Sequence, residues 1–112
     1  MKIKRFKIND IERGRIAVAD TFALRLRGLL GRDFRYFDAL ILLPCSEIHT
    51  CFMPYPIDVL FLSGSRQIIR IKENVPPWTM CAGEKGAWCV VELPAGRAGD
   101  WGLHDGDWVE LF

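Results

Sequence analysis

The chain has 112 residues, 50% of them hydrophobic, and carries 15 basic against 14 acidic side chains. This length predicts one domain with a packed core, and the balanced charge argues against nucleic acid or an anionic membrane as a partner. No apolar run approaches the roughly 20 residues of a membrane-spanning helix, and no signal-peptide region precedes the first predicted strand. We therefore expect a single soluble, cytoplasmic and monomeric domain over residues 1–112.

Two strands and a helix are predicted in the first third of the chain. Apolar residues alternate with polar ones over 2–8 and 14–19, around a turn at Asn9-Asp10, which is typical of short strands. The basic residues of the first strand are expected to form one solvated face that discourages edge-to-edge pairing. The apolar spacing then becomes helical near residues 20–30, with Asp20 predicted as the N-cap and Gly31 as the end.

The rest of the chain predicts short strands separated by turns. Apolar and branched residues indicate strands over residues 39–43, 57–62, 67–72, 87–93 and 108–112. The second and third of these flank a short link containing glycine, as in a hairpin. The stretch Glu73–Gly86, interrupted by proline and glycine, is predicted to be a surface loop. Many short strands with one helix predict a mainly β fold, either a compact β-sandwich or a small barrel-like domain.

Reactive side chains are concentrated between Cys45 and Asp58. If this stretch is extended, Cys45, Glu47, His49 and Cys51 share one face. At roughly 3.3 Å per residue, however, Cys45 and Cys51 then lie about 20 Å apart, too far for one tetrahedral metal ion to bridge. A helical turn would instead bring Cys45 close to His49, with further ligands still needed from elsewhere. We predict no metal and no cofactor.

The proximity of Cys45 and His49 also leaves open a thiol nucleophile activated by an imidazole. Proximity in sequence is weak support, because such pairs usually meet in space and nothing here specifies an oxyanion hole. Asp58 shares a strand face with two leucines, so partial burial is expected. Its carboxylate would then accept hydrogen bonds either from His49 or from backbone amides of the turn at 54–56. No catalytic residue is assigned.

Three more side chains are candidates for a pocket. Glu92 shares a predicted strand face with Val90 and is therefore expected to point inward. Trp78 stands in the predicted loop and forms either a lid on the core or one wall of a pocket. Met53 either lines a cavity or packs in the core. These alternatives are left open by the sequence.

Several short motifs stand in a specific order. They comprise Cys45, Ile48-His49-Thr50, Met53, Pro56-Ile57-Asp58-Val59 and Phe61-Leu62, then residues 73–78 and 91–96, Gly102-Leu103 and Gly106-Asp107, with residues 25–30 upstream. In this order they resemble the domain-of-unknown-function family 192, over about residues 19–112. The resemblance implies a compact, predominantly β domain and no known reaction. The resemblance also implies that many relatives carry N-terminal export signals, and this chain is expected to depart from them by beginning directly at the domain. The motif positions expected to line a site are Cys45, His49, Thr50, Asp58 and Glu92.

The sequence thus favours a small noncatalytic binding domain. Its pocket is predicted between the segment 45–58 and the loop 73–86, and its ligand is an unidentified small molecule or a protein partner. The candidate binding residues are Cys45, His49, Thr50, Met53, Asp58, Trp78 and Glu92. One alternative is a thiol-dependent hydrolase using Cys45, His49 and Asp58. Another is an accessory protein that acts through an exposed apolar surface.

Overall fold

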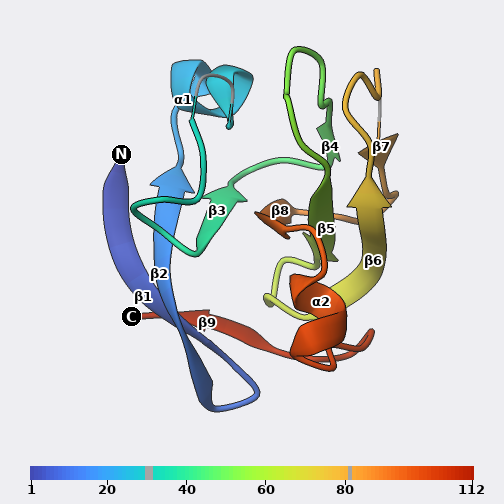
Figure 1. The fold of residues 1–112 in the computed structure, drawn as a ribbon. Coiled ribbons are helices and arrows are strands. Elements are labelled where there is room, and N and C mark those ends of the chain that lie inside the picture. The colour runs from blue at the N-terminus through green and yellow to red at the C-terminus, as the bar shows by residue number, and fades with distance from the viewer. Residues whose placement is uncertain (30–31, 81) are drawn as a thin grey trace.

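Seven strands form one strongly curled sheet in the computed structural model, which describes residues 1–29, 32–80 and 82–112 (Figure 1). Side by side they are β6 (Ile68–Val75), β5 (Ile57–Leu62), β8 (Cys89–Pro94), β3 (Ala39–Leu42), β2 (Ile11–Ala19), β1 (Lys2–Ile8) and β9 (Val109–Leu111). The remaining described elements are the paired strands β4 (Glu47–Ile48) and β7 (Ala82–Gly83) and the helices α1 (Phe22–Arg27) and α2 (Arg97–Asp100). The prediction of a mainly β, barrel-like domain with a short helix near residues 20–30 is confirmed.

The curl brings the two outermost strands of the sheet together at one end. Gln67, just before β6, forms an isolated antiparallel bridge with Trp108, just before β9. The Ile68 amide donates to the Asp107 carbonyl at 2.8 Å, and the Val109 amide donates to the Arg66 carbonyl at 2.9 Å. The sheet is therefore a half-barrel that these few bonds close at a single point.

Period-two alternation divides the core into two apolar clusters. On β5, Val59 and Phe61 belong to one cluster, whereas Leu60 and Leu62 belong to the other. All six β5 residues are buried because β6 and β8 pair with its two edges and apolar side chains cover both faces. The central strands therefore supply a rigid support for the loops at their ends.

Helix α1 differs from its prediction at both ends. Thr21 is the N-cap instead of Asp20, because its hydroxyl accepts the Leu24 amide at 3.2 Å. The helix ends at Arg27, since Gly28 adopts a φ of +52°, a conformation that glycine tolerates. The predicted end at Gly31 lies outside the described residues. In the part of the chain that is described, no helix has the length and apolar character needed to cross a membrane.

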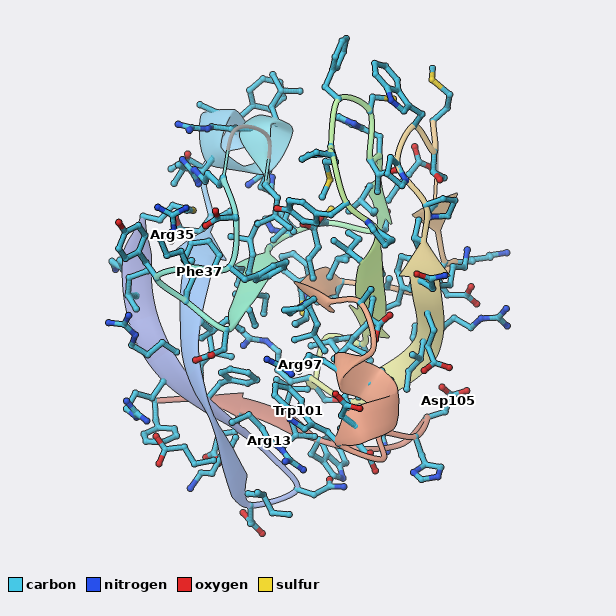
Figure 2. The ribbon with its side chains drawn as sticks, in the orientation of Figure 1. Arg13, Arg35, Phe37, Arg97, Trp101 and Asp105 are labelled. Atoms are coloured by element: carbon cyan, nitrogen blue, oxygen red, sulfur yellow. The ribbon has the colours of Figure 1, made fainter. Side chains whose placement is uncertain are left out.

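The predicted loop Glu73–Gly86 is partly regular. Strand β6 continues to Val75, which pairs with Ile57 beyond an irregularity in the ladder, and Ala82–Gly83 forms β7 against β4. Helix α2 lies in a Gly-rich segment and was not predicted, because four residues are too few to show helical spacing. The Trp101 ring that follows α2 lies 5.0 Å from the Arg13 guanidinium carbon and 6.0 Å from that of Arg97 (Figure 2).

Candidate functional site

A pocket of about 290 Å³ lies between α1 and the segment that runs from β3 through β4. Figure 1 shows α1 and the loop after β4 at the same end of the molecule. The apolar lining residues are Phe22, Leu26, Gly28, Leu29, Leu42, Ile48 and Met53. The polar and thiol-bearing ones are Arg25, Arg27, Cys45, Glu47, His49, Cys51 and Glu92. This volume accommodates about ten water-sized groups, which suits a small organic molecule.

Glu92 contributes a buried carboxyl group to the pocket. Its position on β8 pairs with Leu40 of β3 and Val59 of β5, and its residue surface is 3% exposed. The Oε2 atom has no hydrogen-bond partner among the described residues. Burial raises the pKa of Glu92 to about 8, because the charged form loses its hydration. The carboxyl group is therefore mostly protonated at neutral pH and offers one unsatisfied oxygen.

Cys45 lies between β3 and β4 with its thiol partly buried. Its Sγ donates to the Glu47 carbonyl oxygen at 3.2 Å. Burial raises the pKa of this thiol, and the acidic Glu92 acts in the same direction, whereas Arg25 opposes it. A reactive cysteine requires the opposite shift. The surroundings of Cys45 therefore favour an unreactive, neutral thiol.

His49 lines the same pocket from the loop after β4. Its Nδ1 accepts the Cys51 amide at 3.2 Å, so the neutral ring carries its proton on Nε2. The His49 side chain is otherwise exposed. Among residues 1–29, 32–80 and 82–112, no three histidine, cysteine or acidic side chains are placed to hold one metal ion.

Thr50 ties two loops together and does not line this pocket. Its hydroxyl donates to the Pro76 carbonyl at 2.6 Å and accepts the Thr79 amide at 2.9 Å. Its carbonyl also accepts the Trp78 amide at 2.9 Å. Trp78 is 60% exposed, and its ring packs against the Phe52 ring in a tilted arrangement, with centroids 4.6 Å apart and an interplanar angle of 60°. Both aromatic residues have positive φ values, of 64° and 66°, which side-chain-bearing residues adopt at a cost.

Asp58 is fully buried in β5, and the structure joins it to backbone amides. Its Oδ1 accepts the Asn74 amide at 2.8 Å, while its Oδ2 accepts the Gly96 and Ala98 amides at 3.0 and 2.9 Å. Backbone amides are thus its partners, although they come from other segments than the expected turn at 54–56. The carboxylate links the end of β6 to the start of α2 and does not orient His49.

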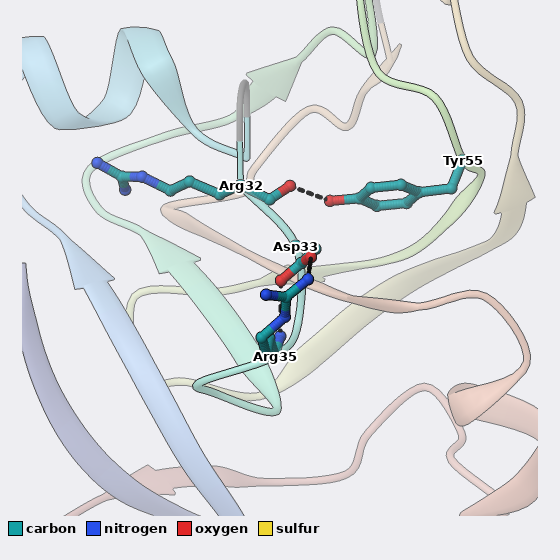
Figure 3. A network of polar contacts seen from close by, with 4 residues as sticks. All are labelled: Arg32, Asp33, Arg35 and Tyr55. Atoms are coloured by element: carbon teal, nitrogen blue, oxygen red, sulfur yellow. Dashed lines mark hydrogen bonds and ion pairs between the residues drawn. The ribbon is translucent and has the colours of Figure 1, made fainter.

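A second polar network fixes the chain that returns from α1 to β3 (Figure 3). The Tyr55 hydroxyl donates to the Arg32 carbonyl at 2.7 Å, and the Arg35 amide donates to Asp33 Oδ1 at 3.0 Å. The Tyr55 ring also packs against Phe34 with centroids 6.2 Å apart. This network holds the segment after α1 against the loop that carries Met53.

The structure brings together Cys45, His49, Met53 and Glu92, and it places Thr50, Asp58 and Trp78 outside the pocket lining. The described residues of the loop 73–86 do not line the pocket either, because α1 forms the opposing wall. The sequence did not predict this wall of the pocket. One feature of the sequence pointed to this wall, since the family resemblance includes residues 25–30, which overlap the pocket lining.

Comparison with known proteins places the chain in a family. Residues 4–111 match the model of DUF192, described as "Uncharacterized ACR". A UPF0127 protein from Thermococcus sibiricus is 35% identical over 88 residues, which cover 74% of this chain and 56% of that protein. A UPF0127 protein from Pyrococcus horikoshii is 30% identical over 105 residues, covering 88% and 89% of the two chains. The chain spans only 56%, 64% and 65% of three Thermococcus relatives.

Two solved structures share the fold. One, a proposed transcription regulator from Sinorhizobium meliloti, has a TM-score of 0.84 at 21% identity and covers 98% of this chain and 94% of its own. The other, a protein of unknown function from Novosphingobium aromaticivorans, has a TM-score of 0.77 at 24% identity and covers 96% and 82%. These likenesses establish the fold alone. On the match over residues 4–111, the chain belongs to the DUF192 family of uncharacterised proteins.

Proposed function

We propose that this domain binds a small, partly apolar molecule in the pocket between α1 and the β3–β4 segment. The observation that carries the proposal is the Glu92 carboxyl group, which lines the pocket with its Oε2 atom unpartnered. A buried polar atom without a partner costs about 1–3 kcal/mol, so a ligand that donates to it relieves an existing penalty. Few polar groups among apolar walls are typical of small-molecule sites.

The apolar residues at the helix side extend this site outward. Phe22 is 74% exposed and Leu26 is 64% exposed, and both line the pocket from α1. Covering large, exposed apolar side chains with a ligand removes apolar surface from water, which favours binding by about 25 cal/mol per Å² of surface. The ligand therefore combines a polar group near Glu92 with an apolar part along α1.

Chemical-shift mapping tests this proposal. We would record ¹H–¹⁵N spectra of the domain with n-pentylamine, 1-pentanol, pentanamide and pentanoate, each at millimolar concentration. We expect at least one probe to shift the amides of Cys45, Ile48 and Glu92 in a saturable manner. Leu26→Ala is expected to weaken that binding about threefold or more, whereas Ile11→Ala, at an exposed position of β2 outside the pocket lining, is expected to leave it unchanged. No saturable shift with any probe would overturn the proposal.

Two alternatives make different predictions. A thiol-dependent enzyme requires an activated Cys45 and an Asp58 that orients His49, and neither requirement is supported by the contacts described above. A protein contact would instead use the exposed aromatic pair Phe52 and Trp78, which lies outside the pocket lining. The double variant Phe52→Ser, Trp78→Ser is expected to leave probe binding unchanged, and a loss of probe binding would assign this pair to the ligand site. A cytoplasmic location and a monomeric state stay predictions.

A further inference from the structure

We infer that the pocket selects ligands with a primary ammonium or amidinium group, held by Glu92, and an apolar body that lies along α1. This inference rests on the proposed function and names the chemical class of its ligand. Two features of the lining carry it, namely the balance of hydrogen-bond donors and acceptors and the distribution of charge.

The pocket lining contains carboxyl oxygens that are free to accept hydrogen bonds from a ligand. The Oε2 atom of Glu92 is buried without a partner, and the exposed carboxylate of Glu47 also lines the pocket. The guanidinium of Arg25 is directed to main-chain oxygens, since its Nη1 lies 3.3 Å from the Asp20 carbonyl and 3.4 Å from the Leu43 carbonyl. A ligand that donates hydrogen bonds completes the partnering of Glu92 once this group ionises, and a cationic N–H group makes the strongest such bonds to a carboxylate.

The charges also set the orientation of the ligand. The two arginines of the lining, Arg25 and Arg27, both belong to α1, whereas Glu47 and Glu92 belong to β4 and β8. A cation is therefore repelled from the helix side and attracted to the strand side. Phe22 and Leu26 then face the apolar part of the same molecule.

Binding of a cation is linked to loss of a proton. Below the raised pKa of Glu92, the ammonium meets a neutral carboxyl group, which ionises as the ion pair forms and releases its proton to the buffer. An alkylamine, with a pKa near that of lysine at about 10.4, stays charged throughout. The affinity is therefore expected to rise about tenfold per pH unit from pH 6 to pH 7 and to level off above pH 8.

Other ionisable groups face the same space and must be separated from Glu92. They are Arg25 and Arg27 on α1 and Cys45, Glu47, His49 and Cys51 around β4. Tyr55, in the loop before β5, lies outside the lining and interacts with Glu92 electrostatically. The variant His49→Gln removes the imidazole from this lining and is expected to keep the pH dependence of amine binding above pH 6.5.

Isothermal titration calorimetry with n-pentylamine tests the inference. At pH 6.5 we expect about one proton released per ligand, measured from the difference in heat between phosphate and Tris buffers. We expect Glu92→Gln to abolish that release and to weaken binding at pH 7.5 at least tenfold. The matched variant Glu110→Gln, which replaces an exposed glutamate of β9 outside the pocket lining, is expected to change affinity less than twofold.

The outcomes distinguish this inference from the proposed function. If 1-pentanol, pentanamide or pentanoate binds as tightly as n-pentylamine, the inference is overturned while the binding function stands. Binding of the amine without proton release at pH 6.5 also overturns it, and this measurement needs no variant, so it holds even if Glu92→Gln fails to fold. If none of the four probes binds, the proposed function fails as well.

Discussion

Asp58 and Glu92 are both buried acids, yet their surroundings give them different roles. Asp58 accepts three backbone amides, one from the end of β6 and two from the start of α2. The Oε2 atom of Glu92 accepts none from the described residues. A carboxylate whose oxygens are satisfied by the main chain holds the fold together, whereas an unsatisfied one is left for a ligand.

Replacing Asp58 is expected to destabilise the fold. In Asp58→Asn one carboxylate oxygen becomes an amide group that cannot accept, so at least one buried backbone N–H loses its partner. We expect the free energy of unfolding to fall by about 2–4 kcal/mol, measured by urea denaturation with tryptophan fluorescence. The matched variant Asp105→Asn, exposed at the surface (Figure 2), is expected to change it by less than about 0.5 kcal/mol. A loss below about 1 kcal/mol in Asp58→Asn would contradict this role.

Glu92 is expected to make stability depend on pH. Its pKa is about 8 in the folded chain and near 4.5 when exposed, so between these values the folded state binds more protons than the unfolded state. The free energy of unfolding therefore falls as pH rises from 4.5 to 8, by up to about 1.4 kcal/mol per pH unit from this residue.

Comparison with Glu92→Gln isolates this contribution. The variant cannot ionise, so we expect it to be less affected by pH and to be more stable than the parent by several kcal/mol at pH 8, on the order of 3–5. Urea denaturation at pH 5, 6, 7 and 8 measures the difference between the two curves. Parallel curves for parent and variant would show that Glu92 is not buried in its neutral form.

The cysteines are expected to differ in reactivity. Cys89 is 2% exposed, and burial raises its pKa to about 11, so iodoacetamide at pH 7.5 should leave it unlabelled in the folded protein. Cys45 should react more slowly than the same residue in the urea-unfolded chain. Peptide mapping by mass spectrometry reads each site separately. Fast, selective labelling of Cys45 in the folded state would restore the thiol-enzyme hypothesis.

Among the elements, the loops after β4 and β6 depend on one threonine. Thr50 is fully buried and makes its hydroxyl bonds to Pro76 and Thr79, beside the strained Phe52 and Trp78. Residues with positive φ persist only where surrounding contacts hold them. The Thr50 hydrogen bonds thus hold in place the two loops that carry the exposed aromatic rings.

The variant Thr50→Val keeps the shape of the side chain and removes both hydroxyl bonds. We expect faster hydrogen exchange at the Thr79 and Trp78 amides and a loss of about 1–3 kcal/mol in the free energy of unfolding. Thr21→Ala serves as the reciprocal control, because its hydroxyl caps α1 and its loss should affect the Leu24 amide instead. Unchanged exchange at Thr79 in Thr50→Val would contradict the proposed support.

Sequence patterns predicted the strands well and the site only in part. The β5–β6 hairpin was predicted from two apolar runs that flank a link containing glycine, and the inward direction of Glu92 from the alternation of side chains along a strand. The α1 wall of the pocket could not be predicted in this way. Phe22 and Leu26 have the helical spacing that is typical of core residues, yet both are exposed. Which segments face each other across a pocket depends on how the sheet curls, and local spacing carries no information on that.

At the scale of the whole molecule, β9 is the strand that completes the half-barrel. Val109 is 3% exposed, pairs with Ile8 of β1 and packs in the cluster that contains Leu60 of β5. Because one cluster spans strands from both ends of the chain, the domain is expected to unfold as one cooperative unit.

Val109→Ala tests this cooperativity. We expect the free energy of unfolding to fall by about 1–3 kcal/mol, through lost apolar burial. Native-state hydrogen exchange should show the same decrease at the Leu60 amide of the distant strand β5. Leu111→Ala, at a half-buried position of β9, is expected to cost less. A decrease confined to β9 and β1 would show that the sheet edge opens independently of the core.

The pairing of β1 with β9 has a consequence for synthesis on the ribosome. Lys7 pairs with Glu110. The outer edge of β1 therefore stays unpaired until a strand about a hundred residues later in the chain has been translated. At about 5–20 residues per second, this wait is on the order of 5–20 seconds. During that time the nascent hairpin of β1 and β2 exposes an open edge to other chains. Lys2, Lys4, Arg5 and Lys7 place positive charge along that strand and so repel a second copy emerging from a neighbouring ribosome.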